Sequence, residues 1–303
     1  NNPATDTLRV GELFSLGNRV WFDTNNNSQI DAGEIGADNV TIHLYSADAG
    51  GNPSGSMLAS QTTSGGGYYR FDDLAPGDYV DVIPSSNFEN GNSLAGYWSS
   101  STFMNADGSI AEVPAPDPDF GLDGVPGGGD DDRDNDDNGT RQGGGAFAGA
   151  VISNAVTLGP GGVEPVDDAD APVMDPAGEA PNDRSNRTVD FGFYRQQLGN
   201  LVFVDINGNG AYNAGTDTLV QDAIVRLYSS DGTEINVGPD GILGTTDDAP
   251  GGVTTGSDGV YLFSGLPQGD YIVRVTPPSG FTSTVDTANA GDTNNPIYNV
   301  DNN

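Results

Sequence analysis

The chain has 303 residues, with 45 glycines, 19 prolines and no cysteine, so disulfide bonds cannot stabilise it. Its 44 acidic residues outnumber 10 basic ones, all of them arginine, and the formal net charge is −34. This charge argues against nucleic acid and anionic membranes as partners, and no apolar run is long enough for membrane insertion.

Residues 1–15 precede the first repeated block, and we interpret them as an N-terminal extension. Its run TLRVGELF (Thr7 to Phe14) is a candidate donor strand. The block that follows, LGNRVWFDTNNN from Leu16, recurs as LGNLVFVDINGN from Leu198. Two later blocks recur in the same order: VTIHLYSAD (40–48) with IVRLYSSD (224–231), and GGYYRFDDLAPGDYVDVIP (66–84) with DGVYLFSGLPQGDYIVRVTP (258–277).

Apolar residues alternate within these blocks, as in Val40, Ile42 and Leu44. Runs of period two bounded by Gly, Pro and Asp are typical of half-buried strands, and several per repeat indicate a sandwich. The sequence therefore predicts an all-β chain of two tandem Greek-key (prealbumin/Ig-like) β-sandwich domains, covering residues 16–195 and 196–303.

The first repeat contains a loop, DTNNNSQIDAGE, whose oxygen-bearing side chains have the spacing that surrounds a hard cation such as Ca²⁺. Ser28 stands where such loops usually have glycine, which predicts a strained turn. We expect the calcium ligands to be Asp23, Asn25, Asn27, the main-chain carbonyl of Gln29, Asp31 and Glu34.

A long Gly- and Asp-rich insertion, residues 117–187, interrupts the first domain. Within it, Ala146 to Leu158 predicts a strand, and TVDFGFY (188–194) after it predicts the closing strand of domain one. The run DDDRDNDDN places acidic side chains at alternate positions, where they repel one another unless a cation binds. It is either a solvated acidic loop or a further calcium site, with the candidate ligands Asp130, Asp132, Asp134 and Asp136, followed by Asn138.

The second repeat carries its own loop, DINGNGAYNAGT, with Gly210 at the turn. Thr216 replaces the glutamate of the first loop, and Asp217 can substitute through a one-residue bulge. The candidate ligands are Asp205, Asn207, Asn209, the Ala211 carbonyl, Asn213 and Asp217. A looser cluster of Asp240, Asp247 and Asp248, joined by Asp258, is a further candidate site or a solvated acidic turn.

In their order, these motifs resemble the B-type repeat domains of bacterial serine–aspartate-repeat surface proteins, within the collagen-adhesin B-type, prealbumin-like sandwich superfamily. The resemblance covers nearly the whole chain and includes PDGILGTTDDAPGG (239–252). It implies calcium-binding sandwiches that act as stalks or spacers on the cell surface. Many collagen-adhesin B-type domains contain a Lys–Asn isopeptide bond, which the absence of lysine excludes here.

No counterpart of residues 188–194 follows the second repeat, so domain two is expected to lack its closing strand. A sandwich without that strand exposes an unpaired edge that invites strand addition. Either residues 4–14 of one subunit complete domain two of the next, which makes a head-to-tail filament, or neighbouring domains of a longer array supply the strand. Because the sequence begins with Asn1 and not with Met, we expect it to be a processed mature chain or an excised fragment.

The leading interpretation is therefore an extracellular structural protein with Ca²⁺ as its cofactor, a stalk or filament subunit on a bacterial surface. Extracellular calcium is abundant enough to fill weak sites. The alternative is an adhesin module that binds a carbohydrate or protein through the insertion or Trp98. An enzyme is not expected, because His43, the only histidine, lies in an alternating strand pattern.

Overall fold

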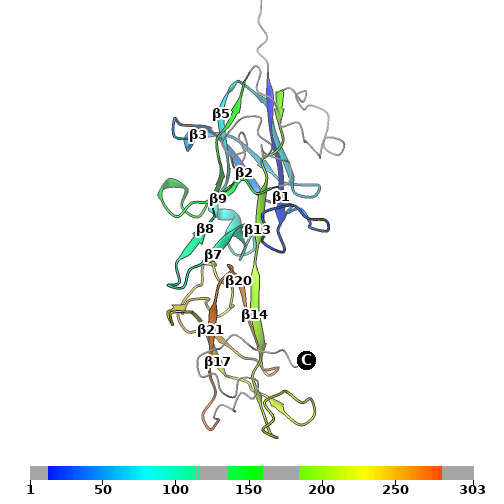
Figure 1. The fold of residues 1–303 in the computed structure, drawn as a ribbon, viewed down its shortest axis with the longest axis vertical. Helices are drawn as coiled ribbons and strands as arrows, with labels where there is room; N and C mark the ends of the chain where they lie inside the picture. The colour runs from blue at the N-terminus through cyan, green and yellow to red at the C-terminus, as the bar shows by residue number, and fades with distance from the viewer. Residues whose placement is uncertain (1–12, 114, 116–135, 160–183, 282–303) are drawn as a thin grey trace, which may run out of the picture. The chain divides into compact units, whose positions relative to one another are not determined.

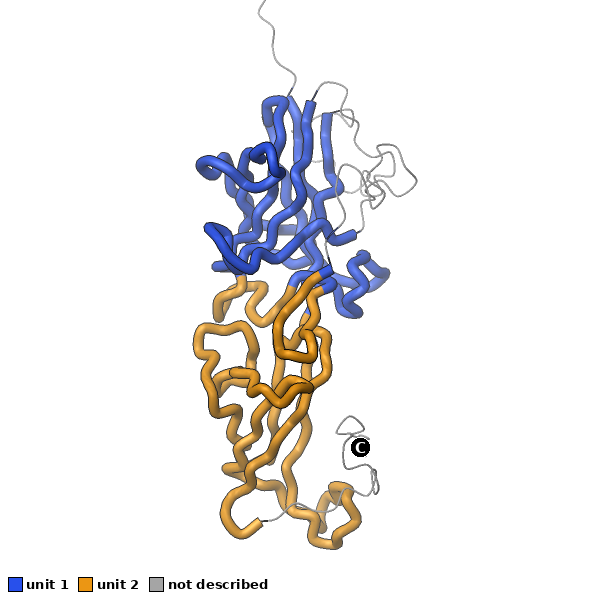
Figure 2. The backbone as a smooth tube through the Cα atoms, turned by 60° about the vertical axis from the view of Figure 1, so that its left-hand side comes forward, with its two compact units in different colours: residues 1–87, 99–101, 113–194 blue, residues 88–98, 102–112, 195–303 orange. Residues whose placement is uncertain are grey.

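The computed structural model describes residues 13–113, 115, 136–159 and 184–281, which form two compact units (Figure 2). Unit 1 contains the described residues of 1–87, 99–101 and 113–194. Unit 2 contains those of 88–98, 102–112 and 195–303. Both units are built from strands, and the predicted all-β fold with two tandem sandwich domains is confirmed.

The first sheet of unit 1 is organised around β1 (Phe14–Phe22; Figure 1). It pairs antiparallel with β4 (Tyr68–Leu74) and parallel with both β12 (Ser185–Asn186) and β13 (Phe191–Tyr194). β13 in turn neighbours β6 (Trp98–Ser99). Residues 185–194 therefore return beside β1 and close this sheet. Phe14 and Ser15, which the sequence assigned to the N-terminal extension, belong to β1 and are buried.

The second sheet of unit 1 has the order β3-β2-β5-β10-β9, with β11 also beside β5. The strand predicted within residues 146–158 is present as β10 and β11, both antiparallel to β5. Val40, Ile42 and Leu44 are fully buried, which confirms the apolar alternation. The strands of this sheet are β2 (Thr41–Ala47), β3 (Pro53–Thr62), β5 (Gly77–Ile83), β9 (Gly139–Arg141), β10 (Val151–Ser153) and β11 (Val156–Leu158).

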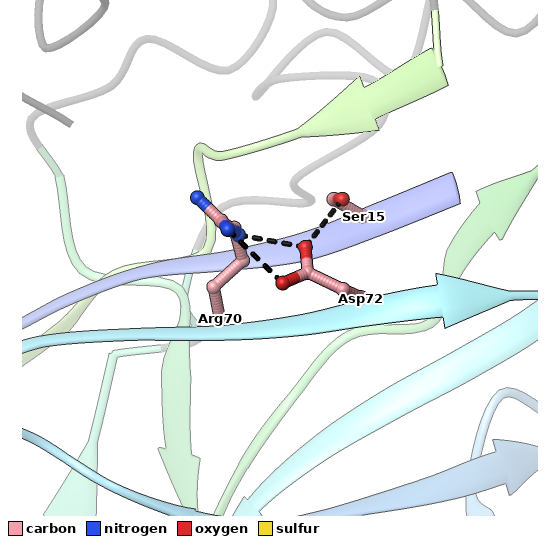
Figure 3. A network of polar contacts seen from close by, with 3 residues as sticks. All are labelled: Ser15, Arg70 and Asp72. Carbon is pink, nitrogen blue, oxygen red and sulfur yellow. Dashed lines mark hydrogen bonds and ion pairs between the residues drawn. The ribbon is translucent and has the colours of Figure 1, made fainter. Parts of the chain in front are cut away.

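A polar network crosses from β1 to β4 in unit 1 (Figure 3). The Oγ of Ser15 donates a hydrogen bond to Oδ1 of Asp72 at 2.7 Å, and Nε of Arg70 also lies 2.7 Å from that oxygen. The contacts lie beside the register shift between Phe14 and Leu16, where regular pairing is interrupted. Side chains therefore hold the two strands together where the ladder is irregular.

Unit 2 repeats the central pairing of unit 1. β14 (Gln196–Leu201) pairs with β20 (Val260–Leu266) so that Leu198 faces Phe263, as Leu16 faces Phe71. β17 (Ile224–Ser229) pairs with β21 (Tyr271–Thr276) as β2 pairs with β5. The shorter strands of unit 2 are β7 (Thr102–Met104), β8 (Ile110–Glu112), β15 (Phe203–Val204), β16 (Thr218–Leu219), β18 (Glu234–Ile235) and β19 (Val253–Thr254).

The segments 88–98 and 102–112 differ from their sequence assignment, because they lie in unit 2 and not in the first domain. Met104 is 7% exposed and packs in the apolar core of unit 2 with Val225 and Phe263. Its main-chain N–H donates to the carbonyl of Gln268 at 2.6 Å. Burial of an apolar side chain from this segment explains why it belongs to unit 2.

The described residues contain two 3-10 helices, η1 (Ser85–Phe88) and η2 (Gly145–Phe147). Neither is long or apolar enough to cross a bilayer.

Candidate calcium loops

The first loop begins where β1 ends, and its first carboxylate is held inside the protein. Asp23 has 0% of its surface exposed, and its main-chain N–H donates to the carbonyl of Phe193 on β13. Its carboxylate accepts hydrogen bonds from the main-chain N–H groups of Asn27 and Ser28 and from Oγ of Ser100 at 2.7 Å. These donors compensate a buried negative charge and fix the orientation of the carboxylate.

The remaining side chains of the first loop converge on Asp31. The amide nitrogens of Asn25 and Asn27 donate to Oδ2 of Asp31 at 2.7 and 2.9 Å. Glu34 accepts hydrogen bonds from the main-chain N–H groups of Thr24 at 2.6 Å and Asp31 at 3.1 Å. Asp31 therefore links Asn25 and Asn27, through its carboxylate, to Glu34, through its main-chain N–H.

The backbone of loop one contains the strain that the sequence predicted. Ser28 has φ of 62° and Asn26 has φ of 57°, both in the left-handed region. Their counterparts in loop two are Gly210 and Gly208, with φ of 78° and 68°. Glycine adopts this conformation at low cost, whereas Ser28 does so with support from its bond to Asp23.

The second loop has the same arrangement. Asp205 accepts from the main-chain N–H groups of Gly208 and Gly210, each at 2.8 Å. The amides of Asn207 and Asn209 donate to Oδ1 of Asn213 at 2.8 and 2.7 Å. Asn213 thus takes the place of Asp31, with a neutral amide in place of a carboxylate.

Asp217 occupies the position in loop two that Glu34 occupies in loop one. Its carboxylate accepts from the main-chain N–H groups of Ile206 at 3.0 Å and Asn213 at 2.7 Å. These residues correspond to Thr24 and Asp31. The shorter aspartate, one residue later in the chain, therefore bonds the same two main-chain groups as the glutamate.

Gln29 and Ala211, the residues expected to offer a main-chain carbonyl to the cation, have equivalent hydrogen bonds in the two loops. The main-chain N–H groups of Gln29 and Ala211 each donate at 2.9 Å, to Oδ1 of Asn27 and of Asn209. Gln29 also forms an antiparallel bridge with Asp136, the one of the run's four candidate carboxylates that the structure describes. Asp130, Asp132 and Asp134 lie outside the described residues.

Asp137 and Asn138, which follow Asp136, make hydrogen bonds within unit 1. Asp137 accepts hydrogen bonds from the N–H groups of Gly139 and Gly192, and its own N–H donates to the carbonyl of Ser28. Oδ1 of Asn138 accepts from the N–H of Asp190 at 2.8 Å. The end of the acidic run therefore ties loop one to the closing strand. Local sequence gives no signal for these contacts, because the partners are far apart in the chain.

The third candidate cluster is held together by a turn in unit 2. Asp240 accepts from the N–H of Ile242, and Asp248 from the N–H of Gly244. Oγ1 of Thr245 donates to Oδ1 of Asp247 at 2.7 Å. Burial raises the pKa of Asp248, and the nearby carboxylates of Asp240 and Asp247 raise it further. Asp258 accepts instead from the N–H of Val260.

The donor sets of the two loops consist of carboxylate and amide groups, the ligand types that hard cations take. No group of three or more His, Cys, Asp or Glu side chains suited to a metal occurs among the described residues. Each loop relies on asparagine amides as well as carboxylates, and an amide turned by 180° presents oxygen where it now presents nitrogen. Asn25 and Asn27 both donate to Oδ2 of Asp31, so this rotation would turn both amide oxygens toward that carboxylate.

Two residues singled out for other functions are engaged in the fold. Trp98 is 6% exposed, and its Nε1 donates to the carbonyl of Gly265 at 2.5 Å. Its indole is therefore not displayed for a ligand. His43 lies on β2 beside Tyr45, with ring centroids 6.5 Å apart, and burial lowers its pKa.

A family model described as the SdrD B-like domain matches residues 14–113 and 196–301, one segment in each repeat. Serine-aspartate repeat-containing protein D of Staphylococcus aureus (strain Newman) is 26% identical over 90% of this chain and 23% of that protein. Serine-aspartate repeat-containing protein F of Staphylococcus epidermidis is 27% identical over 96% of this chain and 13% of that protein. Colossin-B of Dictyostelium discoideum is 35% identical over 85 residues, which are 25% of this chain and 2% of that protein. The chain thus spans less than a quarter of the length of these curated relatives.

Several solved structures of pilins show a weak likeness. The shaft pilin SpaA from Lactobacillus rhamnosus GG is 13% identical over 90% of each chain, with a TM-score of 0.34. GBS52, the minor pilin of Streptococcus agalactiae, is 14% identical over 89% of this chain and 86% of its own, with a TM-score of 0.28.

Proposed function

Because the chain belongs to the SdrD B-like domain family, we propose that it is a calcium-stabilised structural segment of a bacterial cell-surface protein, within a stalk or filament. The observation that carries the proposal is the repeated geometry of the two loops. Glu34 and Asp217 stand at different places in the sequence yet bond equivalent main-chain groups. Two loops that reach one arrangement by different residues indicate a shared requirement for it.

The residues that would hold Ca²⁺ are those gathered in each loop. Loop one supplies three carboxylates, from Asp23, Asp31 and Glu34, whereas loop two supplies two, from Asp205 and Asp217. Because affinity rises with ligand charge, loop one is the tighter site. A bound cation would also relieve part of the repulsion within a chain of net charge −34. We extend the proposal to the acidic run and to the turn at Asp240, Asp247 and Asp248.

The stalk or filament assembles head-to-tail by strand complementation in this proposal. Its support is the first sheet of unit 2, where β14 pairs with β20 alone among the described strands. In unit 1 the equivalent strand has partners on both edges. An open strand edge is a site for strand addition. Neighbouring domains of a longer chain are the other source of such a strand.

The calcium proposal is tested by thermal unfolding of the chain with and without a chelator. We expect chelation to lower the unfolding temperature and added Ca²⁺ to restore it, because a ligand that binds the folded state stabilises it by mass action. An unchanged unfolding temperature in chelator would overturn the calcium claim.

A pair of loop variants locates the effect. Glu34→Ala combined with Asp217→Ala removes one carboxylate from each loop, and we expect calcium affinity in a titration to fall by at least about tenfold. The control is Glu89→Ala, an exposed glutamate outside the loops, which should leave the calcium response unchanged. Equal affinities in the double variant and the control would place the ions elsewhere.

A further inference from the structure

Unit 1 shows which edge of the central strand receives the closing strand. The N–H of Val20 donates to Gly67, and the N–H of Phe22 donates to Ile35, so both residues face away from β13. The N–H of Asp23 donates to Phe193, so the alternate residues face β13. The closing strand therefore bonds the edge presented by Trp21 and Asp23.

Unit 2 differs from unit 1 at the corresponding edge. The N–H of Val202 donates to the carbonyl of Gly259, and the carbonyl of Val202 accepts from the N–H of Val220. Val20 of unit 1 makes the same two bonds, with the carbonyl of Gly67 and the N–H of Ala37. β15 pairs with β16 on that same side. No strand lies along the opposite edge, at Phe203 and Asp205, among the described residues.

The exposed fractions of matched residues differ between the units in the same way. Val20, Trp21 and Asp23 each have 0% of their surface exposed. Their counterparts Val202, Phe203 and Asp205 are only half-buried. Since the sequences LGNRVWFD and LGNLVFVD are so similar, the added exposure accompanies the lack of a neighbouring strand among the described residues.

The closing strand of unit 1 also shows which residue a strand at this edge must place opposite the aromatic side chain of the central strand. Trp21 faces Gly192, and a Cβ added at Gly192 would lie 2.7 Å from Cζ2 of Trp21 and would collide with Oγ of Ser100. An aromatic side chain on the central strand thus demands glycine opposite it. Phe203 places an aromatic side chain at the matching position of unit 2.

We propose that the edge at Phe203 and Asp205, at β15, binds residues 4–12 of a second copy of this chain, in the parallel register in which β13 pairs with β1. This rests on the proposed function and names the partner of its assembly. The segment TLRVGELF carries Val10 and Gly11 at the spacing of Phe191 and Gly192 in TVDFGFY. Gly11 then lies opposite Phe203, and Val10 lies opposite Val202.

The absence of cysteine permits a direct test of this register, since engineered thiols have no native competitors. A Val10→Cys, Val202→Cys double variant should form a ladder of disulfide-linked oligomers under mild oxidation, because paired Cα positions are within disulfide reach. The matched control, Val10→Cys with Val275→Cys, places the second thiol on an exposed residue of β21 and should give no ladder.

Mixing experiments distinguish the source of the strand. A tagged Val10→Cys chain mixed with an untagged Val202→Cys chain should give a covalent heterodimer that extends no further. A disulfide-linked monomer from the double variant, without a ladder, would overturn binding by a second copy. No disulfide at these positions would overturn the register. Equal ladders from the control would show non-specific contact and would also overturn the proposal.

A glycine variant tests the steric requirement. Gly11→Val should lower the yield of the ladder by at least about tenfold, because it places a branched side chain against Phe203. Asn2→Val, outside the proposed donor, should not change the yield, and an unchanged yield from Gly11→Val would contradict the steric requirement. Chelator-dependent unfolding of the Gly11→Val chain, measured separately, shows whether calcium stabilisation persists when assembly fails.

Discussion

At the scale of single residues, Asp81 is a buried carboxyl group in the second sheet of unit 1. It lies on β5 with 1% of its surface exposed, and its Oδ2 accepts a hydrogen bond from the Tyr69 hydroxyl at 2.8 Å. Its Oδ1 is buried and has no hydrogen-bond partner among the described residues. Burial raises the pKa of Asp81 to about 7, although the bond from Tyr69 lowers it. The corresponding residue in unit 2 is Val273, which faces Leu227 as Asp81 faces Leu44.

This burial predicts the pH dependence of unit 1. The pKa of Asp81 is higher in the folded state than the 3.8 of the unfolded chain, so the folded state holds the proton more tightly. The contribution of Asp81 to the free energy of unfolding is therefore fully present below about pH 4. It is lost as the pH rises to about 7, and the loss is on the order of 4 kcal/mol. We expect Asp81→Val to remove that loss, and unit 1 to be more stable at pH 8.

The pH dependence of the stability of unit 1 can be measured by the fluorescence of a single tryptophan. A Trp98→Phe background leaves Trp21, which is fully buried in unit 1. Denaturant unfolding at pH 4 and pH 8 should show a smaller pH difference for Asp81→Val than for its parent. Asp78→Asn, on the exposed side of the same strand, should retain the parental difference. Parallel pH profiles for Asp81→Val and its parent would refute the assignment.

At the scale of elements, the hairpin of β7 and β8 is the clearest departure from the sequence interpretation. β7 precedes the first insertion in the chain, yet Met104 packs among the core residues of unit 2. The main-chain bond from Met104 to Gln268 and a parallel bridge between Phe103 and Gln268 add to this packing. The second repeat therefore depends on a segment encoded before it, and residues 195–303 are not a complete folding unit.

Met104→Ala should consequently destabilise unit 2 by about 3 kcal/mol, as expected when a buried methionine is truncated. A Trp21→Phe background leaves Trp98 to report on unit 2, and denaturant unfolding gives the free energy. Met57→Ala is the matched control, because Met57 is 46% exposed on β3 and should change stability little. Equal effects of the two substitutions would contradict the role of the hairpin.

The strand pairs show which parts of the fold were predictable at this scale. Alternation in VTIHLYSAD and the repeat of GDY identified β2, β5, β17 and β21 because a two-residue period is local. The closing strand at residues 188–194 was also recognisable from its apolar run. β10 and β11 lie within the insertion, and their pairing with β5 joins segments far apart in the chain, for which alternation does not specify partners.

At the scale of the whole molecule, net charge governs how solution conditions affect stability. The chain carries −34 without a single lysine, and self-repulsion disfavours compact states. Monovalent salt screens this repulsion over a distance that falls from about 30 Å at ~0.01 M to about 3 Å at ~1 M.

We therefore expect the unfolding temperature in chelator to rise by several degrees as NaCl increases over that range, measured by circular dichroism. Calcium chloride at matched ionic strength should give a larger rise than sodium chloride, because it adds site binding to screening. A fall in the unfolding temperature with added NaCl would show that screened attractive pairs outweigh the repulsion.

The sequence by itself determined the repeated sandwich, its strands and the two loops, because period-two alternation and loop spacing are encoded within short segments. Loop one even predicted a strained turn at Ser28, which has φ of 62°. The sequence also offered Asp217 as the substitute for Glu34. Tertiary structure alone decided that Ser100 and Asp137 support loop one and that Met104 belongs to unit 2. These features join residues distant in the chain or depend on where side chains end in space, and local periodicity carries no information about either.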